Sequence, residues 1–179
     1  MGILTETFIK DLVWSYHEFL ETNKGIKPDL YRHPLRRVVV NKRLKRALGR
    51  ASVRGTVELA GFFVGLEKTE ETINQLSDTI LHELAHLYVG IEESHNNAWQ
   101  NMASHMGANP ETYANVTGEV REATLPPWVL VATLDTGKSV NCKTAHKRTF
   151  KYLKNPSAYS INGVKVHKFE WVKLSKNSA

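Results

Sequence analysis

Residues 78–88 of the chain read Asp-Thr-Ile-Leu-His-Glu-Leu-Ala-His-Leu-Tyr, a run of good helix formers that contains His-Glu-x-x-His. One helical turn separates His82 from His86, so both imidazoles leave the same face of the helix. Two imidazoles in this arrangement can occupy two corners of a tetrahedral Zn²⁺ site, and Glu83 can take a proton from water held there. The motif therefore predicts a catalytic zinc site with Glu83 as its base.

The residues around the motif favour a long helix. Apolar residues recur every three or four positions, at Ile73, Leu76, Ile80, Leu84, Leu87 and Ile91. On a helical wheel this stripe lies about 140° from the midpoint of the two histidines, so one face can be buried while the other lines a cleft. Thr72 and Gln75 fit a capping box near the start of the helix, and Gly90 can end it.

A tetrahedral zinc site with one water needs a third protein ligand, and His95 is the first candidate. Trp99, Met102 and Met106 follow at helical spacing, and Gly107 can end that second helix. If the second helix folds back on the first, its first turn brings His95 over the face that carries His82 and His86.

Three other residues could complete the site. His105 lies roughly 15 Å further along the second helix, which makes it harder to place. Glu119 and Glu122 would fit a zinc site whose last ligand is a glutamate from a later segment.

The motif at residues 82–90, the spacing to His95, and the residues Trp99 and Met102 resemble the SprT-like family, which includes the Spartan proteases that degrade proteins crosslinked to DNA. The resemblance covers roughly residues 5–110, and Asn96 stands where the family usually has Gly. It implies Zn²⁺ as the cofactor and a catalytic glutamate at Glu83. It also implies an α+β fold, in which a zincin-like helical metalloprotease core holds a short sheet. The ligands that it implies are His82, His86 and His95.

Many members of that family carry a Cys-rich zinc ribbon after the core, but this chain has a single cysteine, Cys142. A four-cysteine ribbon is therefore impossible, although its strands could survive without the metal. Cys142 with His146 and His167 could bind a metal in principle, whereas an idle thiol is the simpler interpretation.

The composition of the chain bears on its cellular compartment and on whether it is associated with a membrane. A single cysteine rules out an intrachain disulfide and fits a reducing compartment. There is no long apolar run for a membrane span, and residues 1–10 do not resemble a secretion signal. We expect a monomer without a membrane partner, located in the cytoplasm and associated with the nucleoid, or nuclear in a eukaryote.

Charge is distributed unevenly along the chain. Residues 1–54 contain 12 Lys and Arg against 5 Asp and Glu, residues 55–127 contain 2 against 11, and residues 128–179 contain 10 against 2. Two basic segments thus flank an acidic catalytic one, an asymmetry that can attract a polyanion. Solvated surface lysines are the alternative explanation. DNA, single-stranded or branched, is the partner that we expect.

The segment before the motif predicts a helix over residues 5–23 and a strand at 38–40. Asn41 can cap a brief helix at residues 42–48, whose Arg43 and Arg46 would face water or phosphate. Residues 52–66 are strand-like, and we expect part of residues 56–64 to pair with an extended substrate. Tyr113 is a candidate to stabilise an oxyanion, although a packed surface tyrosine is the simpler interpretation.

Pro126-Pro127 marks a change of pattern, so we divide the chain into a core at residues 1–125 and a small antiparallel β subdomain at 126–179. A strand is predicted at residues 128–134, and Asn162-Gly163 predicts a two-residue hairpin. The subdomain has basic residues close to Phe150 and Tyr152, an arrangement that suits single-stranded nucleic acid unless the aromatics form its core. These basic candidates are Lys143, Lys147, Arg148 and Lys151.

Three functions remain open. The first is a zinc endopeptidase acting on DNA-associated or DNA-crosslinked proteins. The second is a general zinc peptidase without a nucleic-acid role, and the third is a DNA-binding adaptor with an inert metal site. Glu83 argues against the adaptor, because a structural metal site needs no base.

Overall fold

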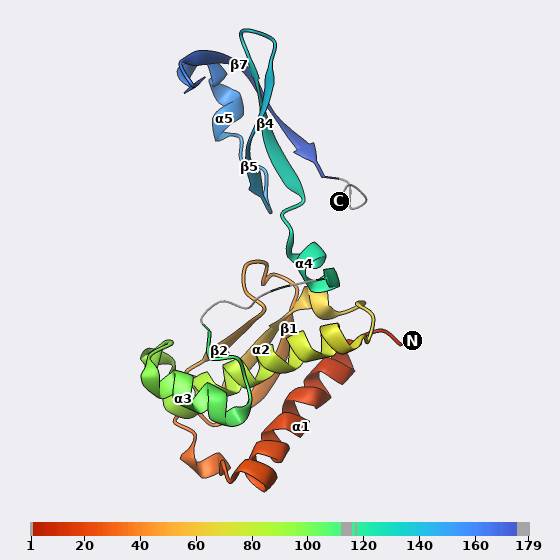
Figure 1. Cartoon of the computed structure of the whole chain (residues 1–179), viewed down its shortest axis with the longest axis vertical. Coiled ribbons are helices and arrows are strands. Elements are labelled where there is room, and N and C mark those ends of the chain that lie inside the picture. The colour runs from red at the N-terminus through yellow and green to blue at the C-terminus, as the bar shows by residue number, and fades with distance from the viewer. Residues whose placement is uncertain (1, 112–115, 117, 175–179) are drawn as a thin grey trace. The chain divides into compact units, whose positions relative to one another are not determined.

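The computed structural model describes residues 2–111, 116 and 118–174. It divides the chain into two compact units, Met1–Thr124 (the core unit) and Leu125–Ala179 (the C-terminal unit). Helices and two small sheets make up these units, which confirms the α+β class (Figure 1). Among the described residues, no helix is long and apolar enough to cross a membrane.

Two long helices dominate the core unit, and both begin at a threonine. α1 (Glu6–Lys24) starts where the Thr5 side chain accepts a hydrogen bond from the Phe8 N–H, and it ends at Gly25 in the left-handed conformation. α2 (Glu70–Val89) starts in the same way at Thr69, and Gly90 ends it as predicted. The predicted capping box at Thr72 is wrong, because Thr72 lies inside the helix and its N–H is the donor to Thr69.

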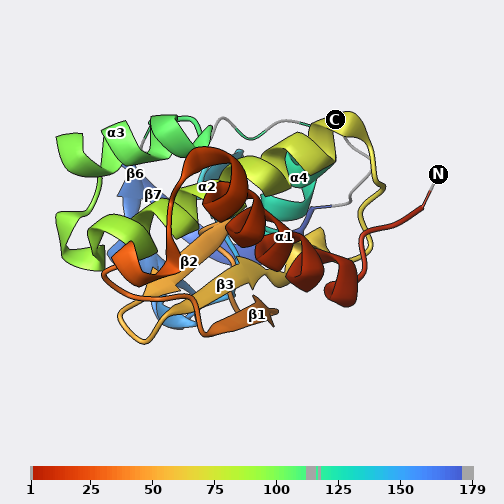
Figure 2. The ribbon, with the colours of Figure 1, turned by 90° about the horizontal axis from the view of Figure 1, so that it is seen from below.

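The first sheet has the strand order β1-β3-β2. β3 (Thr56–Ala60) is central, parallel to β1 (Arg37–Asn41) and antiparallel to β2 (Gly49–Ser52). α1 and α2 lie over one face of this sheet (Figure 2). Short 3-10 turns complete the connections, at Pro28–Leu30, Gly61–Phe63 and Ile91–Glu93.

Two predictions for this region are wrong. Residues 42–48 form no helix, because Asn41 caps a turn instead, accepting a hydrogen bond from the Arg43 N–H at 2.8 Å. The Leu48 carbonyl then accepts a hydrogen bond from the Ala60 N–H at 2.8 Å and starts the ladder of β2. β3 has a neighbour on each side, so residues 56–60 have no free edge for a substrate, and residues 61–63 form a 3-10 turn.

The core unit ends with α3 (Asn97–Met106) and α4 (Gly118–Thr124). α3 begins at Asn96, whose side chain accepts hydrogen bonds from the N–H groups of Ala98 and Trp99, and it ends at Gly107 as predicted. α2 packs against both of these helices. His95 therefore stands just before α3 and not in its first turn.

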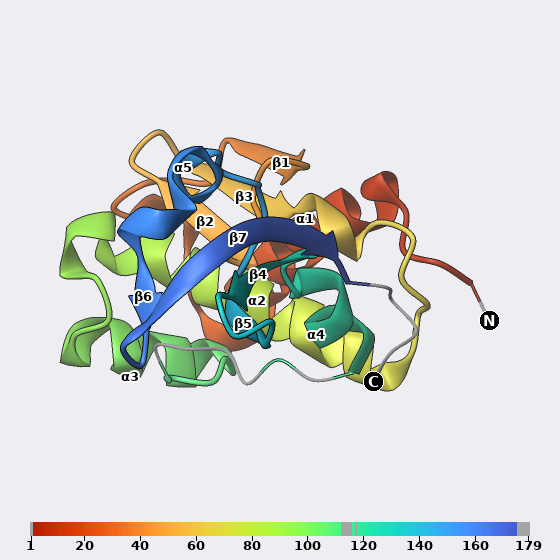
Figure 3. The ribbon, with the colours of Figure 1, turned by 90° about the horizontal axis from the view of Figure 1, so that it is seen from above.

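The C-terminal unit is built on an antiparallel sheet with the order β5-β4-β7-β6. Its strands are β4 (Trp128–Leu134), β5 (Ser139–Ala145), β6 (Ser160–Ile161) and β7 (Val164–Lys173). β7 is the long curved strand of Figure 3. The predicted hairpin at Asn162-Gly163 is present, and both residues have the positive φ that such a turn requires.

A small hydrophobic core lies against this sheet. Its buried members are Leu130, Ala132, Leu134, Val166 and Phe169. Tyr152 of α5 (Lys151–Lys154) and Tyr159, which follows the 3-10 turn Pro156–Ala158, pack on it. Tyr152 thus contributes to the core, whereas Phe150 is 68% exposed.

Candidate metal centre

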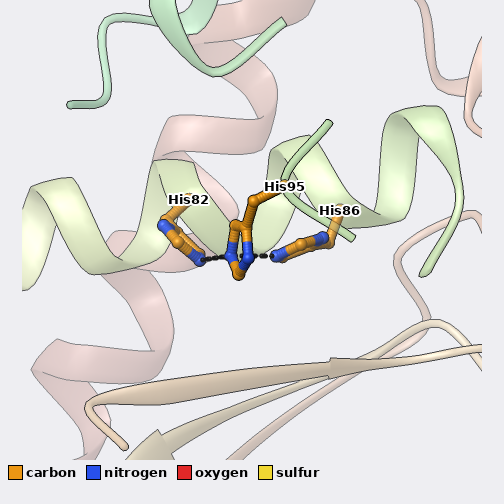
Figure 4. A group of neighbouring side chains, drawn as sticks. All are labelled: His82, His86 and His95. Atoms are coloured by element: carbon orange, nitrogen blue, oxygen red, sulfur yellow. Dashed lines mark hydrogen bonds between the residues drawn. The ribbon is translucent and has the colours of Figure 1, made fainter. Parts of the chain in front are cut away.

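Three imidazoles converge on one point of the core unit. His82 and His86 project from α2, and the ring of His95 stands between them (Figure 4). The Nε2 atom of His95 lies 3.1 Å from that of His82 and 3.2 Å from that of His86. Ligand atoms of all three residues lie within 4.8 Å of one another, and they form the one group of three or more candidate metal ligands among the described residues.

The chain between α2 and α3 turns sharply enough to bring His95 back over α2. Gly90 has φ 109° and its N–H donates to the His86 carbonyl, while Ser94 adopts a positive φ of 50°. Arg32 forms ion pairs with Glu92 and with Glu93 in this turn. The Arg32 N–H also donates to the carbonyl of Tyr88, so the residues before β1 hold both the end of α2 and the turn that follows.

Trp99 forms the floor beneath the three rings. Its side chain is fully buried, and its ring centroid lies 4.6 Å from that of His82, 5.1 Å from that of His86 and 4.5 Å from that of His95. The indole Nε1 has no hydrogen-bond partner within the described part of the chain. Trp99 therefore supports the imidazoles through packing alone.

The electrostatics of the cluster favour neutral imidazoles. Burial, followed by the neighbouring rings, lowers the pKa of His82 to about 3. Burial, followed by the His95 ring, lowers the pKa of His86 to about 4, and burial also lowers the pKa of His95. A neutral imidazole offers a lone pair to a metal ion, so all three residues are in the protonation state that a ligand needs.

The donor geometry fits a divalent metal ion. In a tetrahedral zinc site, the ligand nitrogens are about 3.3–3.4 Å apart, close to the separations that His95 makes here. One Nε2 atom can donate or accept a single good hydrogen bond, so His95 cannot satisfy both of its neighbours. A cation at the centre would satisfy every lone pair at once. His86 would then carry its proton on Nδ1, a buried atom for which the described residues provide no partner.

Glu83 follows His82 on α2, and its side chain points towards Gly49 of β2. The residue is 5% exposed, and burial raises the pKa of its carboxyl group to about 8, although the Ala51 N–H and the Arg50 guanidinium both lower it. Its side chain lies so close to Gly49 that a methyl group there would come within 2.8 Å of Glu83 Cγ. The edge of the sheet thus holds the carboxylate in place beside the histidine cluster.

The alternative ligands do not join this cluster. His105, Glu119 and Glu122 are absent from it, and the Glu119 carboxylate instead accepts a hydrogen bond from the Glu67 N–H. Cys142 is an exposed free thiol and forms no metal-ligand group with described histidines. Tyr113 lies outside the described residues.

The predicted nucleic-acid residues occur in both units. Arg43 and Arg46 are exposed in the connection between β1 and β2. In the C-terminal unit, Lys143 contacts the Tyr152 ring, with its Nζ 4.2 Å from the ring centroid. Arg148 lies over the Trp128 ring at 4.6 Å.

Lys147 and Lys151 are also exposed, and they flank the exposed Phe150 in the chain. The four predicted basic residues of the C-terminal unit thus divide into Lys143 and Arg148, which lie over aromatic rings, and Lys147 and Lys151, for which no such contact is present.

Two parts of the site were missed by sequence reasoning. In the sequence, Gly49 directly follows the helix predicted at residues 42–48, and Arg32 is one of the basic residues of segment 1–54. Both act on residues far along the chain, Glu83 and Glu92 respectively, and no local periodicity points to either contact.

A helix that carries two histidines and a glutamate, with a third histidine folded back over it, is typical of a metallopeptidase-like domain. The chain belongs to the SprT-like family, whose family model matches residues 10–119, and this confirms the resemblance. No curated protein and no solved structure matches the chain significantly.

Proposed function

We propose that this protein is a zinc-dependent endopeptidase with a zincin-like core that cleaves DNA-associated or DNA-crosslinked proteins. The convergence of three imidazole Nε2 atoms on one point, with Glu83 next to His82 in the chain, supports the peptidase part. The family and the charge distribution support the DNA part.

His82, His86 and His95 would hold the metal ion, which supplies Lewis acidity towards water and towards the scissile carbonyl when it is bound. Glu83 accepts the proton of the attacking water and returns it to the leaving amine. A buried carboxylate suits this role because its raised pKa makes it a better base than an exposed glutamate. Trp99 packs beneath the three imidazoles and holds their rings in place.

The edge strand β2 is our candidate for pairing with the substrate, in place of β3. β2 contacts α2 and has β3 as a neighbour on one side only. Its backbone can therefore add an extended peptide as a further strand, and such pairing gives loose sequence specificity. In an extended peptide, every second N–H would face β2. Methylation of one of those N–H groups should abolish cleavage of the peptide, whereas methylation of an N–H that points away should be tolerated. Uniform tolerance of N-methylation would argue against strand pairing.

Glu83→Gln and His95→Ala test the peptidase proposal. Glu83→Gln should bind zinc at the wild-type stoichiometry and lose turnover by at least about 10²-fold, because only the base is removed. His95→Ala should lose zinc, and His105→Ala is the matched control that should retain both zinc and activity. Wild-type zinc content in His95→Ala, or wild-type turnover in Glu83→Gln, would refute the assignment.

The C-terminal unit supports a contact with single-stranded DNA. Lys143 and Arg148 lie over aromatic rings, so of the four predicted basic residues Lys147 and Lys151 are the ones that we expect to bind phosphate, and Phe150 offers a base-stacking surface. The double variant Lys147→Glu and Lys151→Glu should weaken DNA binding by about tenfold or more at low salt.

The control for that variant is an equal change of charge in the core unit, Lys24→Glu with Lys27→Glu, which should have a smaller effect. Cleavage of a DNA-binding protein should be measured with and without single- and double-stranded DNA. Stimulation by DNA supports the proposal, cleavage that ignores DNA favours a general peptidase, and DNA binding without cleavage favours an adaptor.

A further inference from the structure

The side chains on the face of the first sheet that packs against the helices become much smaller at the edge strand β2. The residues of β1 and β3 that face the helices are large and apolar, namely Val38, Val40, Val57 and Leu59. The residues of β2 paired with Leu59 and Val57 are Gly49 and Ala51. The sheet therefore has a recess at Gly49, and the buried side chain of Glu83 fills it.

The recess has no room for a side chain. A Cβ atom at Gly49 would lie 2.8 Å from both Cγ and Oε1 of Glu83 and 2.9 Å from Cγ2 of Thr79. Such separations are shorter than van der Waals contact, so Glu83 would have to move. Gly49 is not among the glycines with positive φ, so the backbone conformation itself would accept alanine. Space alone requires glycine at this position.

The backbone of β2 pairs with β3 on one side only. Because the Leu48 carbonyl accepts a hydrogen bond from Ala60, the antiparallel ladder places the hydrogen-bonded pairs at Leu48, Arg50 and Ser52. The N–H groups of Gly49 and Ala51 then point away from β3, towards the free edge of the sheet. β2 thus supplies the empty space that fixes the Glu83 side chain and leaves its outer N–H groups on the open edge.

We propose that Gly49 is a positioning residue, which sets the location of the Glu83 carboxylate by leaving the recess free. This inference rests on the proposed function of Glu83 as the base. Displacing a catalytic group by about 1 Å can reduce turnover by about 10²-fold. Gly49→Ala should therefore reduce kcat by that factor while KM changes less than about threefold. Its zinc affinity should stay at the wild-type value, because the atoms nearest to the new Cβ belong to Glu83 and Thr79 and not to a histidine.

Gly61→Ala is the matched control. Its Cβ would meet the Lys42 backbone, with 2.7 Å to Cα, so it imposes a similar clash away from Glu83. It should lower the unfolding midpoint and leave kcat per folded molecule unchanged. If Gly49→Ala and Gly61→Ala reduce kcat equally, Gly49 has only a structural role and the proposal is overturned.

A double-mutant cycle separates positioning from other effects. In the Glu83→Gln background, Gly49→Ala should cause no further loss of kcat, because the group that it displaces has already lost its function. Independent, multiplicative losses would overturn the proposal. If Gly49→Ala folds poorly, Thr79→Ser removes the Cγ2 contact and keeps a hydroxyl for the Gln75 carbonyl. The double variant Gly49→Ala with Thr79→Ser should fold and still have a reduced kcat. Recovery of the wild-type kcat in this double variant would overturn the proposal.

A crystal structure of Gly49→Ala measures the position of Glu83 directly, without relying on peptidase activity. Glu83 Cγ should be displaced from its wild-type position while the three imidazoles keep theirs. An unmoved Glu83 would refute the positioning role. An inactive wild-type protein with a displaced Glu83 in the variant would refute the proposed function and leave the recess as described.

Discussion

Replacement of Trp99 tests whether the floor of the histidine cluster acts by packing. Trp99 is fully buried and its Nε1 lacks a hydrogen-bond partner in the described ranges. Trp99→Phe removes two buried carbon atoms, worth roughly 1.5–2 kcal/mol, but also removes an unpaired buried N–H whose burial costs about 1–3 kcal/mol. The two contributions nearly cancel, so we expect a net loss of about 1 kcal/mol or less. Trp99→Ala leaves a cavity and should cost about 3–5 kcal/mol.

Zinc affinity should follow the same order. Phenylalanine keeps a ring beneath the imidazoles, so affinity should stay within about threefold, whereas Trp99→Ala should reduce it about 10–100-fold, as is usual when support of a ligand is lost. Urea unfolding of the metal-free protein gives the stability, and competition with a chromophoric chelator gives the affinity. Trp14→Phe, at a 42% exposed tryptophan, controls for the loss of an indole. If Trp99→Phe costs as much as Trp99→Ala, the indole N–H has a function that packing does not explain.

Three further predictions concern groups around the site. In the metal-free protein, burial raises the pKa of Glu83 to about 8, so the folded chain holds a proton that the unfolded chain releases above about pH 4.5. The contribution of Glu83 to the free energy of unfolding is therefore lost as pH rises from about 4.5 through 8. Glu83→Gln should therefore gain stability over wild type across that interval, and urea midpoints that stay parallel with pH would contradict this. Arg32→Ala removes an exposed ion pair with Glu92, so unfolding measurements should show a loss of about 1 kcal/mol or less, and a larger loss would mean that the turn depends on it. Asn41→Ala removes the 2.6 Å hydrogen bond to Glu58 and the turn cap, and a thermal melt should report a loss of about 1–2 kcal/mol; an unchanged Tm would show that the turn forms without them.

The histidine site could be predicted because its determinants are local. The spacing of His82 and His86 places both on one helical face, Gly90 permits the sharp turn, and Asn96 caps the helix after His95. Each of these features depends on neighbours within a few residues. Helix periodicity and turn chemistry are readable at that range.

The setting of Glu83 could not be predicted because its contacts are distant in sequence. Gly49 follows a basic run that contains Leu44, Ala47 and Leu48, and that pattern suggests a short helix that ends at the glycine. A helix of that length has little stability of its own, so pairing of β2 with β3 prevails. Nothing in the run itself shows that Gly49 faces another part of the chain.

The histidine cluster depends on contacts that are local in sequence, whereas the contact of Glu83 with Gly49 is remote. This difference affects the order in which the parts of the site form during folding. α2 and α3 form a helical hairpin that carries the three histidines and whose contacts are short-range, whereas β1 pairs in parallel with β3 and β2 must then dock on α2. Local helical contacts form faster than long-range strand pairing. We therefore expect the histidine cluster of a nascent chain to form before Glu83 reaches its place beside β2, so that the proposed peptidase activity would arise only with the finished tertiary structure.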